Sequence, residues 1–239
     1  MGLMRLDKFL ADMQVGTRSE VKKLIRAGKV QVDGNTCTKP EEKFDPDQTT
    51  VAVDHVPVEY APYEYFMLNK PKGCVSATED SRYPTVLDYI TEHLRKDLFP
   101  VGRLDLDTEG LLLITNDGAL AHELLSPAKH IAKTYEADID GLVTQEDVRL
   151  FAQGMDIGEK KLTKPAELVI KKANVISQVQ ITIYEGKYHQ IKRMFEAVGK
   201  PVLTLKRIAM GTLLLDESLE PGEYRALTEA EIDYLRQRG

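Results

Sequence analysis

Charged side chains at alternate positions precede a short apolar run in the middle of the chain. They are Arg103, Asp105, Asp107 and Glu109. The apolar run 111–114 lies between Gly110 and the turn residues 116–118, so its length and boundaries predict a buried strand. The charged residues are therefore expected at the mouth of that strand. A carboxylate held there beside a cation can stay ionised and act as a nucleophile or a general base.

The composition is that of an ordinary globular protein. Hydrophobic residues make up 42% and charged residues 29% of the 239 residues, and no apolar run is long enough to cross a bilayer. The chain begins with an amphipathic pattern instead of a secretory signal, so we expect a cytoplasmic protein without a membrane role. Neither the two cysteines nor the five histidines have metal-ligand spacing. We therefore expect neither a disulfide framework nor a metal or other cofactor.

The N-terminal part predicts a small module of two helices and a hairpin. Apolar residues recur at helical spacing over residues 6–13, and Thr17 with Glu20 has the capping-box pattern that begins a second helix. Asp33 and Gly34 form a turn between two alternating runs, which is a strong hairpin signal. The chain has a net charge of -6, but basic residues outnumber acidic ones here, which is compatible with a phosphate-contacting face. The candidates for such contacts are Arg5, Lys8, Arg18, Lys22, Lys23 and Arg26.

A linker and a change of pattern divide the chain into two predicted domains. Two prolines and the lack of a regular period mark residues 57–62, which predicts domains at 1–59 and 60–239. The second domain mixes strands and helices without regular βαβ alternation, and a helix is expected over residues 85–98. We therefore predict an α+β fold in which a mixed, largely antiparallel sheet carries flanking helices.

Three motifs, in this order, resemble those of the RsuA family of RNA pseudouridine synthases. They are Asn-Lys-Pro at 69–71, Gly-Arg-Leu-Asp at 102–105 and His-Gln-Ile-Lys at 189–192. The opening Arg-Leu-Asp-Lys-Phe-Leu at 5–10, with the two helices and the hairpin, resembles the S4 RNA-binding module. The resemblance spans about residues 4 to 235. It implies an N-terminal S4 domain followed by a pseudouridine synthase domain.

The resemblance also implies roles for individual residues. Asp105 stands where the family has its catalytic aspartate, Tyr135 where it has its active-site tyrosine, and Lys192 where it has the basic partner of the aspartate. Arg193 is the alternative partner, because sequence spacing alone does not separate adjacent residues. Arg103 is expected to fill the space of a flipped base or to hold the adjoining phosphate. Further substrate contacts are expected from Asn69, Lys70, His189 and Arg193.

The implied reaction is the isomerisation of uridine to pseudouridine, with the target base flipped out of its stack. Within the family, the runs Tyr-Phe-Met-Leu-Asn-Lys-Pro at 65–71 and Leu-Thr-Lys-Pro-Ala at 162–166 resemble the branch that acts on 16S ribosomal RNA, at position 516 in the usual bacterial numbering. The expected partner is ribosomal RNA, free or in a small-subunit assembly particle, bound by a monomer. A synthase that acts on 23S ribosomal RNA is the alternative.

Two other classes of function remain open from the residues alone. Asp105 and Asp107 are paired carboxylates, as glycoside hydrolysis requires, although a glycosidase does not need the basic N-terminal module. A non-catalytic ribosome-assembly factor would use that module for binding and the rest of the chain as a scaffold. Release of tritium from uridine C5 of labelled RNA would distinguish the isomerase from both alternatives.

Overall fold

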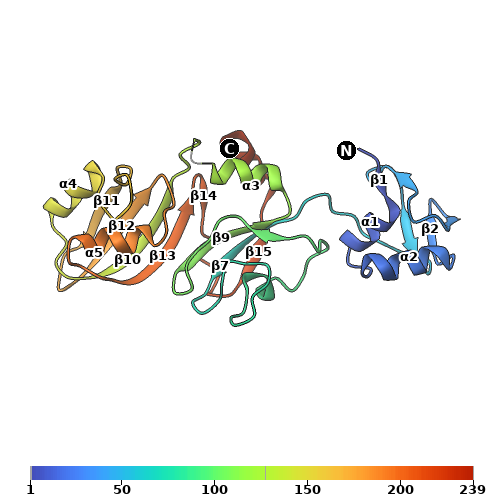
Figure 1. Ribbon diagram of the computed structural model, residues 1–239, viewed down its shortest axis with the longest axis horizontal. Helices are drawn as coiled ribbons and strands as arrows, with labels where there is room; N and C mark the ends of the chain where they lie inside the picture. Colours follow the sequence, from blue (N-terminus) through green and yellow to red (C-terminus); the bar gives the residue numbers. More distant parts are fainter. Residues whose placement is uncertain (1, 127, 239) are drawn as a thin grey trace. The chain divides into compact units, whose positions relative to one another are not determined.

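The chain forms two compact units, and its computed structural model describes residues 2–126 and 128–238 (Figure 1). The smaller unit combines Met1–Glu64 with Thr91–Leu98, and the larger one combines Tyr65–Ile90 with Phe99–Gly239. Each unit has a hydrophobic core of its own. No helix in the described residues is long and apolar enough to cross a membrane.

The smaller unit packs two helices against short antiparallel strands. Helix α1 spans Leu6–Asp12 and helix α2 spans Arg18–Arg26. Strand β1 (Met4–Arg5) pairs with β4 (Lys43–Phe44), and a second sheet has the order β3 (Asn35–Cys37), β2 (Val30–Val32), β5 (Val51–Val53) and β6 (Val56–Pro57). The apolar sides of both helices pack with residues of β2, β4 and β5 in one core.

Local chemistry accounts for these elements. The Thr17 hydroxyl accepts a hydrogen bond from the backbone N–H of Glu20, and the Glu20 carboxylate accepts one from the N–H of Thr17, which completes the capping box. Asp33 and Gly34 both adopt positive φ angles, 48° and 78°, as a two-residue hairpin turn requires. The predicted module of two helices and a hairpin is therefore confirmed.

The helix predicted over residues 85–98 is wrong. Only Val86–Tyr89 forms a short 3-10 helix, and Thr91–Leu98 returns to the smaller unit. There the buried guanidinium of Arg95 lies 3.5 Å from the carboxylate of Asp12. The single domain boundary predicted from the sequence does not include this return, because it depends on contacts between residues far apart in the chain.

The larger unit is built on one mixed sheet. Its main strands are, in spatial order, β11 (Glu167–Lys172), β12 (Ile176–Ile183), β10 (Lys133–Asp140), β13 (Val202–Met210), β9 (Glu109–Thr115), β7 (Tyr65–Lys70) and β15 (Tyr224–Ala226). The short strand β8 (Phe99–Pro100) pairs with β9, and β14 (Leu213–Leu214) pairs with β13. Neighbouring strands are antiparallel except β13 and β9, which run parallel. This is the mixed, largely antiparallel sheet that the sequence predicts.

Two pairs of helices pack on this sheet. Helices α3 (Gly118–Leu125) and α6 (Glu229–Arg238) contact each other beside β14, and helices α4 (Gln145–Gln153) and α5 (Gln190–Ala197) lie by the half formed by β10 to β13 (Figure 1). In the second pair, the rings of Phe151 and Phe195 pack with their centroids 4.7 Å apart. The parallel pair β13 and β9 joins the two halves of the sheet, and the turn that carries Asp105 leads directly into β9.

Gly110 allows the close approach of β9 to β13. Its φ angle is 100°, and a Cβ atom built on it would lie 2.2 Å from the carbonyl oxygen of Arg207. Only a residue without a side chain fits at this position. The backbone immediately after the charged run 103–109 is therefore held against β13.

Replacing Gly110 with alanine is expected to lower the free energy of unfolding by at least about 2 kcal/mol, because the change combines positive-φ strain with a backbone clash. Urea denaturation followed by circular dichroism would measure the difference. Gly118→Ala is the matched control, since Gly118 begins helix α3 and no heavy atom lies within 4 Å of the added Cβ. Equal stability of the two variants would contradict the steric role of Gly110.

Candidate active site

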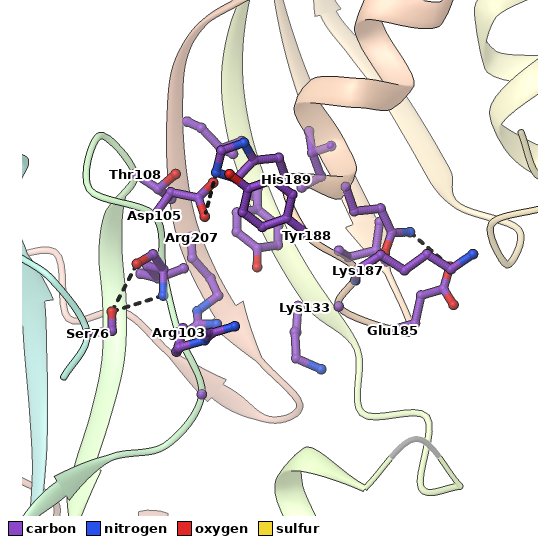
Figure 2. Close-up of a pocket in the computed structure, with 18 of the residues that line it drawn as sticks. Ser76, Arg103, Asp105, Thr108, Lys133, Glu185, Lys187, Tyr188, His189 and Arg207 are labelled. Atoms are coloured by element: carbon purple, nitrogen blue, oxygen red, sulfur yellow. Dashed lines mark hydrogen bonds and ion pairs between the residues drawn. The ribbon is translucent and has the colours of Figure 1, made fainter. Parts of the chain in front are cut away.

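A cavity of about 600 Å³ opens beside the parallel pair of β13 and β9 (Figure 2). Its wall combines the turn at 102–108, strands β10 and β13, and the segment 183–192 that leads into α5. Pockets of this size take small-molecule ligands and cofactors. Asp105, Tyr135 and Lys192, which come from distant parts of the sequence, all line it.

The turn that carries Asp105 is fixed by an adjoining loop. The Ser76 hydroxyl accepts from the N–H and donates to the C=O of Leu104, each at 3.0 Å. The N–H of Gly73 donates to the C=O of Leu106 at 2.8 Å. Because the residues on both sides of Asp105 are held in this way, the direction of its side chain is set by the backbone of the turn.

Lys70 holds the same turn from inside the domain. Its side chain is fully buried, and its ammonium group donates, at 2.9 to 3.1 Å, to the carbonyl oxygens of Pro71, Asp105 and Thr108. Burial lowers the pKa of Lys70, while the three carbonyls accept its three N–H bonds. Asn69 is buried too, and its amide bonds a backbone carbonyl. Both side chains therefore point into the protein and neither lines the cavity, so the substrate contacts predicted for Asn69 and Lys70 would require them to move.

The Asp105 carboxylate faces two basic side chains at the start of α5. Its Oδ2 lies 3.3 Å from Nζ of Lys192. Its Oδ1 lies 3.5 Å from Nε2 of His189, the pair that Figure 2 shows. The carboxylate is 31% exposed, so it remains accessible to a ligand. Arg193, the alternative partner, binds Glu159 at 2.9 Å instead. Of the two adjacent cations, Lys192 is therefore the one that pairs with Asp105.

Lys192 is shared with a second carboxylate. Its Nζ lies 2.5 Å from Oδ1 of Asp107. Burial acts to lower the pKa of Lys192, but the hydrogen bond to Asp107 and the charges of both aspartates outweigh it, so this pKa is raised. Burial likewise acts to raise the pKa of Asp107, and the bond to Lys192 outweighs it and lowers this pKa. Lys192 therefore presents a positive charge to the Asp105 carboxylate.

Tyr135 lies in β10, directly opposite Arg207 of β13. The register shifts between Thr134 and Tyr135 and leaves Ile208 as an extra residue, which is a β-bulge. Residues directly opposite each other on paired strands point to the same face, so Arg207 and Tyr135 share one face of the sheet. Tyr135 is 7% exposed and lines the cavity, so its ring provides a wall on which a planar base can stack.

The other predicted contact residues of this unit separate into two groups. Arg103 and His189 line the cavity, and the ring of His189 stacks on the exposed Tyr188 with the centroids 3.8 Å apart. Arg193 does not line the cavity, because its guanidinium binds Glu159 and two backbone carbonyls. An RNA contact of Arg193 would therefore require these bonds to break.

The basic residues of the smaller unit differ in whether a carboxylate already neutralises them. Nitrogen atoms of Arg5 and Lys22 lie 3.0 and 3.8 Å from the buried carboxylate of Asp7, and Lys8 pairs with Asp12. Within the described residues, a second group on α2 forms no ion pair, namely Arg18, Lys23 and Arg26, all of them exposed. Among the predicted contact residues of this unit, the positive charge that no carboxylate neutralises is therefore on α2.

Lys133 and Arg207 also line the cavity, although they were not predicted as site residues. Lys133 precedes Tyr135 by two positions in one strand, so alternation puts both on the same face and would have identified Lys133. Alternation from the buried Leu205 likewise points Arg207 inward. The cavity thus contains more positive charge than the sequence motifs indicate.

Carboxylates are few in this part of the described structure. Asp105 and Glu185 line the cavity, and Glu185 is occupied by the N–H of Lys164 and the amide of Gln190. Asp107 does not line it, so the pair of Asp105 and Asp107 that the sequence offered for glycoside hydrolysis does not face one ligand. Among the described residues, no group of three or more His, Cys, Asp or Glu side chains could hold a metal ion.

The chain is similar to known RNA-modifying proteins over nearly its whole length. The RNA pseudouridylate synthase family matches residues 64–197, and the S4 domain family matches residues 4–49. The uncharacterized RNA pseudouridine synthase YtzG of Bacillus subtilis is 49% identical over 98% of this chain and 99% of its own length. Ribosomal small subunit pseudouridine synthase A of Escherichia coli is 44% identical over 96% of this chain and 98% of its own length. A solved structure described as the crystal structure of pseudouridylate synthase is 40% identical, with a TM-score of 0.69 over 97% of this chain and 99% of that one.

Proposed function

The chain belongs to the RsuA-like RNA pseudouridine synthases, which are isomerases, and on that premise we propose that it converts one uridine of 16S ribosomal RNA to pseudouridine. The relatives named ribosomal small subunit pseudouridine synthase A support the small-subunit substrate. The observation that carries the proposal is the Asp105 carboxylate, which faces Lys192 and His189 in a cavity that Tyr135 lines.

The reaction exchanges one bond for another within a single nucleotide. The bond between uracil N1 and ribose C1′ breaks, the base turns within the site, and C5 forms the new bond to C1′. C5 then loses its proton and N1 gains one, so the nucleotide keeps its composition and the step balances without an oxidant or a reductant. The base must leave its stack to reach the cavity, at a cost of a few kcal/mol.

The described side chains can carry these steps. Asp105 supplies a negatively charged oxygen beside the reacting nucleotide, and Lys192 supplies the cation next to it. The ring of Tyr135 stacks on the uracil, and its hydroxyl takes part in the transfer of the C5 proton. Arg103 is exposed at the cavity and can occupy the space that the flipped base leaves.

The smaller unit binds the RNA through its phosphates in this proposal. Its S4 module carries the exposed charges of Arg18, Lys23 and Arg26 on one helix. Such charges displace counterions from the RNA backbone, which contributes affinity without reading sequence. Arg5, Lys8 and Lys22 contribute less, since Asp7 and Asp12 already neutralise them in part.

Tritium release tests the proposed function. Transcripts of 16S and 23S ribosomal RNA that carry tritium at uridine C5, alone and with ribosomal proteins bound, would be incubated with the protein. We expect one equivalent of tritium per 16S molecule and none from 23S, with the new pseudouridine at position 516 in the usual bacterial numbering. Release from 23S alone would move the substrate to the large subunit. RNA binding without any release from either RNA would contradict the proposal.

A further inference from the structure

The cavity contains a buried cation that has an unused hydrogen-bond donor. Arg207 is 2% exposed, and its Nε donates to the carbonyl oxygen of Leu111 at 2.7 Å. Its Nη2 is also buried and has no hydrogen-bond partner in the described structure. Buried polar groups are normally satisfied, so an unsatisfied donor on a residue that lines a binding cavity indicates a missing acceptor.

Lys133 gives this part of the cavity a second positive charge. Its ammonium has one hydrogen bond in the described structure, to the carbonyl oxygen of Ile131 at 3.2 Å. Burial lowers the pKa of Lys133, and the charges of Arg207 and Lys164 lower it further. No carboxylate among the described residues pairs with Lys133, Arg207 or the nearby Arg103. Two cations held together in this way repel each other until an anion lies between them.

Arg103, Lys133 and Arg207 all line this cavity. In Figure 2 the side chains of Arg103, Lys133 and Arg207 lie below the pair formed by Asp105 and His189. The pairing of β13 with β10 places Arg207 directly opposite Tyr135. A nucleotide with its base on the Tyr135 ring would therefore have its backbone or the edge of its base within reach of Arg207.

We propose that Arg207 and Lys133 form an anion subsite that holds a phosphodiester next to the flipped uridine. This inference rests on the proposed function in one respect, namely that the ligand is RNA. A phosphodiester is favoured over a uracil carbonyl, because uracil is neutral when it binds and would need only one donor. Two unpaired cations match the charge and the several acceptor oxygens of a phosphate. Arg207 and Lys133 are thus positioning residues, which hold the ribose of the target nucleotide against Asp105.

A binding experiment with neutral linkages tests the subsite. The probe is a 16S ribosomal RNA fragment that the protein modifies, with one methylphosphonate on either the 5′ or the 3′ side of the target uridine. The nucleotide on the 5′ side of that linkage has a 2′-deoxy sugar. The matching all-phosphate RNA has the same 2′-deoxy nucleotide at the same position. Dissociation constants are measured with Asp105→Asn protein, so that no turnover occurs.

One of the two linkages is expected to weaken binding by roughly tenfold, the loss expected for a charge-assisted contact. Adding Arg207→Met or Lys133→Met should weaken binding of the all-phosphate RNA, and the methylphosphonate should then cause little further loss. Lys171→Met is the matched control, since Lys171 is exposed on β11 away from the cavity and should leave the tenfold effect intact. Arg207→Lys keeps the positive charge, so the methylphosphonate should again weaken binding to this variant, although by less than tenfold.

Other results would overturn the subsite. If the methylphosphonate weakens RNA binding as much in the Arg207→Met and Lys133→Met proteins as in the protein without these substitutions, neither side chain contacts that phosphate. If 4-thiouridine or 2-thiouridine at the target weakens binding instead, and this loss disappears in Arg207→Met, the missing acceptor is a base carbonyl. Lys133→Met serves as the second variant if Arg207→Met does not fold. Tritium release by the unsubstituted protein tests the proposed function separately, so the subsite can fail while the isomerase activity stands.

Discussion

Asp105→Asn is expected to reduce the rate of pseudouridine formation by more than about a thousandfold, because a site that loses its reacting group keeps only binding and positioning. The asparagine amide has nearly the shape of the carboxylate but carries no negative charge toward Lys192 and His189, which lie 3.3 and 3.5 Å away. Affinity for RNA should stay within about tenfold, since phosphate contacts elsewhere dominate it. Tritium release and a filter-binding assay would measure the two effects on the same RNA.

Asp107→Asn is the matched control for this substitution. Asp107 lies in the same turn and binds the same lysine, but its side chain is 67% exposed and does not line the cavity. Without the Asp107 carboxylate, Lys192 still pairs with Asp105. Activity should therefore remain within about tenfold of the unsubstituted protein. Loss of RNA affinity in Asp105→Asn, at unchanged affinity in Asp107→Asn, would instead give Asp105 a structural role.

Local patterns predicted the elements that local chemistry controls. The capping box at Thr17 and the turn at Asp33 both depend on neighbours in the sequence, and the structure contains both. The helix predicted for residues 91–98 does not form. These residues instead make long-range contacts, such as the one between Arg95 and Asp12. Periodicity carries no information about a partner that is far away in the chain.

The part of the site that could be predicted is the part that lies in short sequence motifs resembling those of the family. The motifs brought Asp105, Tyr135 and Lys192 together correctly as residues of one cavity. They did not indicate Arg207, although alternation from the buried Leu205 points its side chain inward. They predicted a substrate contact for Lys70, because a lysine directly before a proline in an expected turn has the pattern of a surface residue, whereas Lys70 is the buried last residue of β7. Its burial depends on carbonyl oxygens that a second, distant turn supplies.

Lys70→Met tests that reassignment. Methionine fills a similar volume but leaves the carbonyl oxygens of Pro71, Asp105 and Thr108 without their buried donor. We expect the free energy of unfolding to fall by about 2 to 4 kcal/mol, the usual cost of buried acceptors that lose their partner. Activity should fall with it, because the Asp105 turn loses its support, while the affinity of the folded protein for RNA changes little.

Lys72→Met separates this support from an RNA contact. Lys72 lies in the turn that follows Lys70, but its side chain is 47% exposed and lies 3.5 Å from the carboxylate of Glu109, a surface pair that contributes little to stability. Urea denaturation, tritium release and filter binding would be compared for the two variants. If Lys70→Met were as stable as Lys72→Met and lost mainly RNA affinity, the ammonium of Lys70 would have to reach the RNA, and its carbonyl contacts would not determine the position of Asp105.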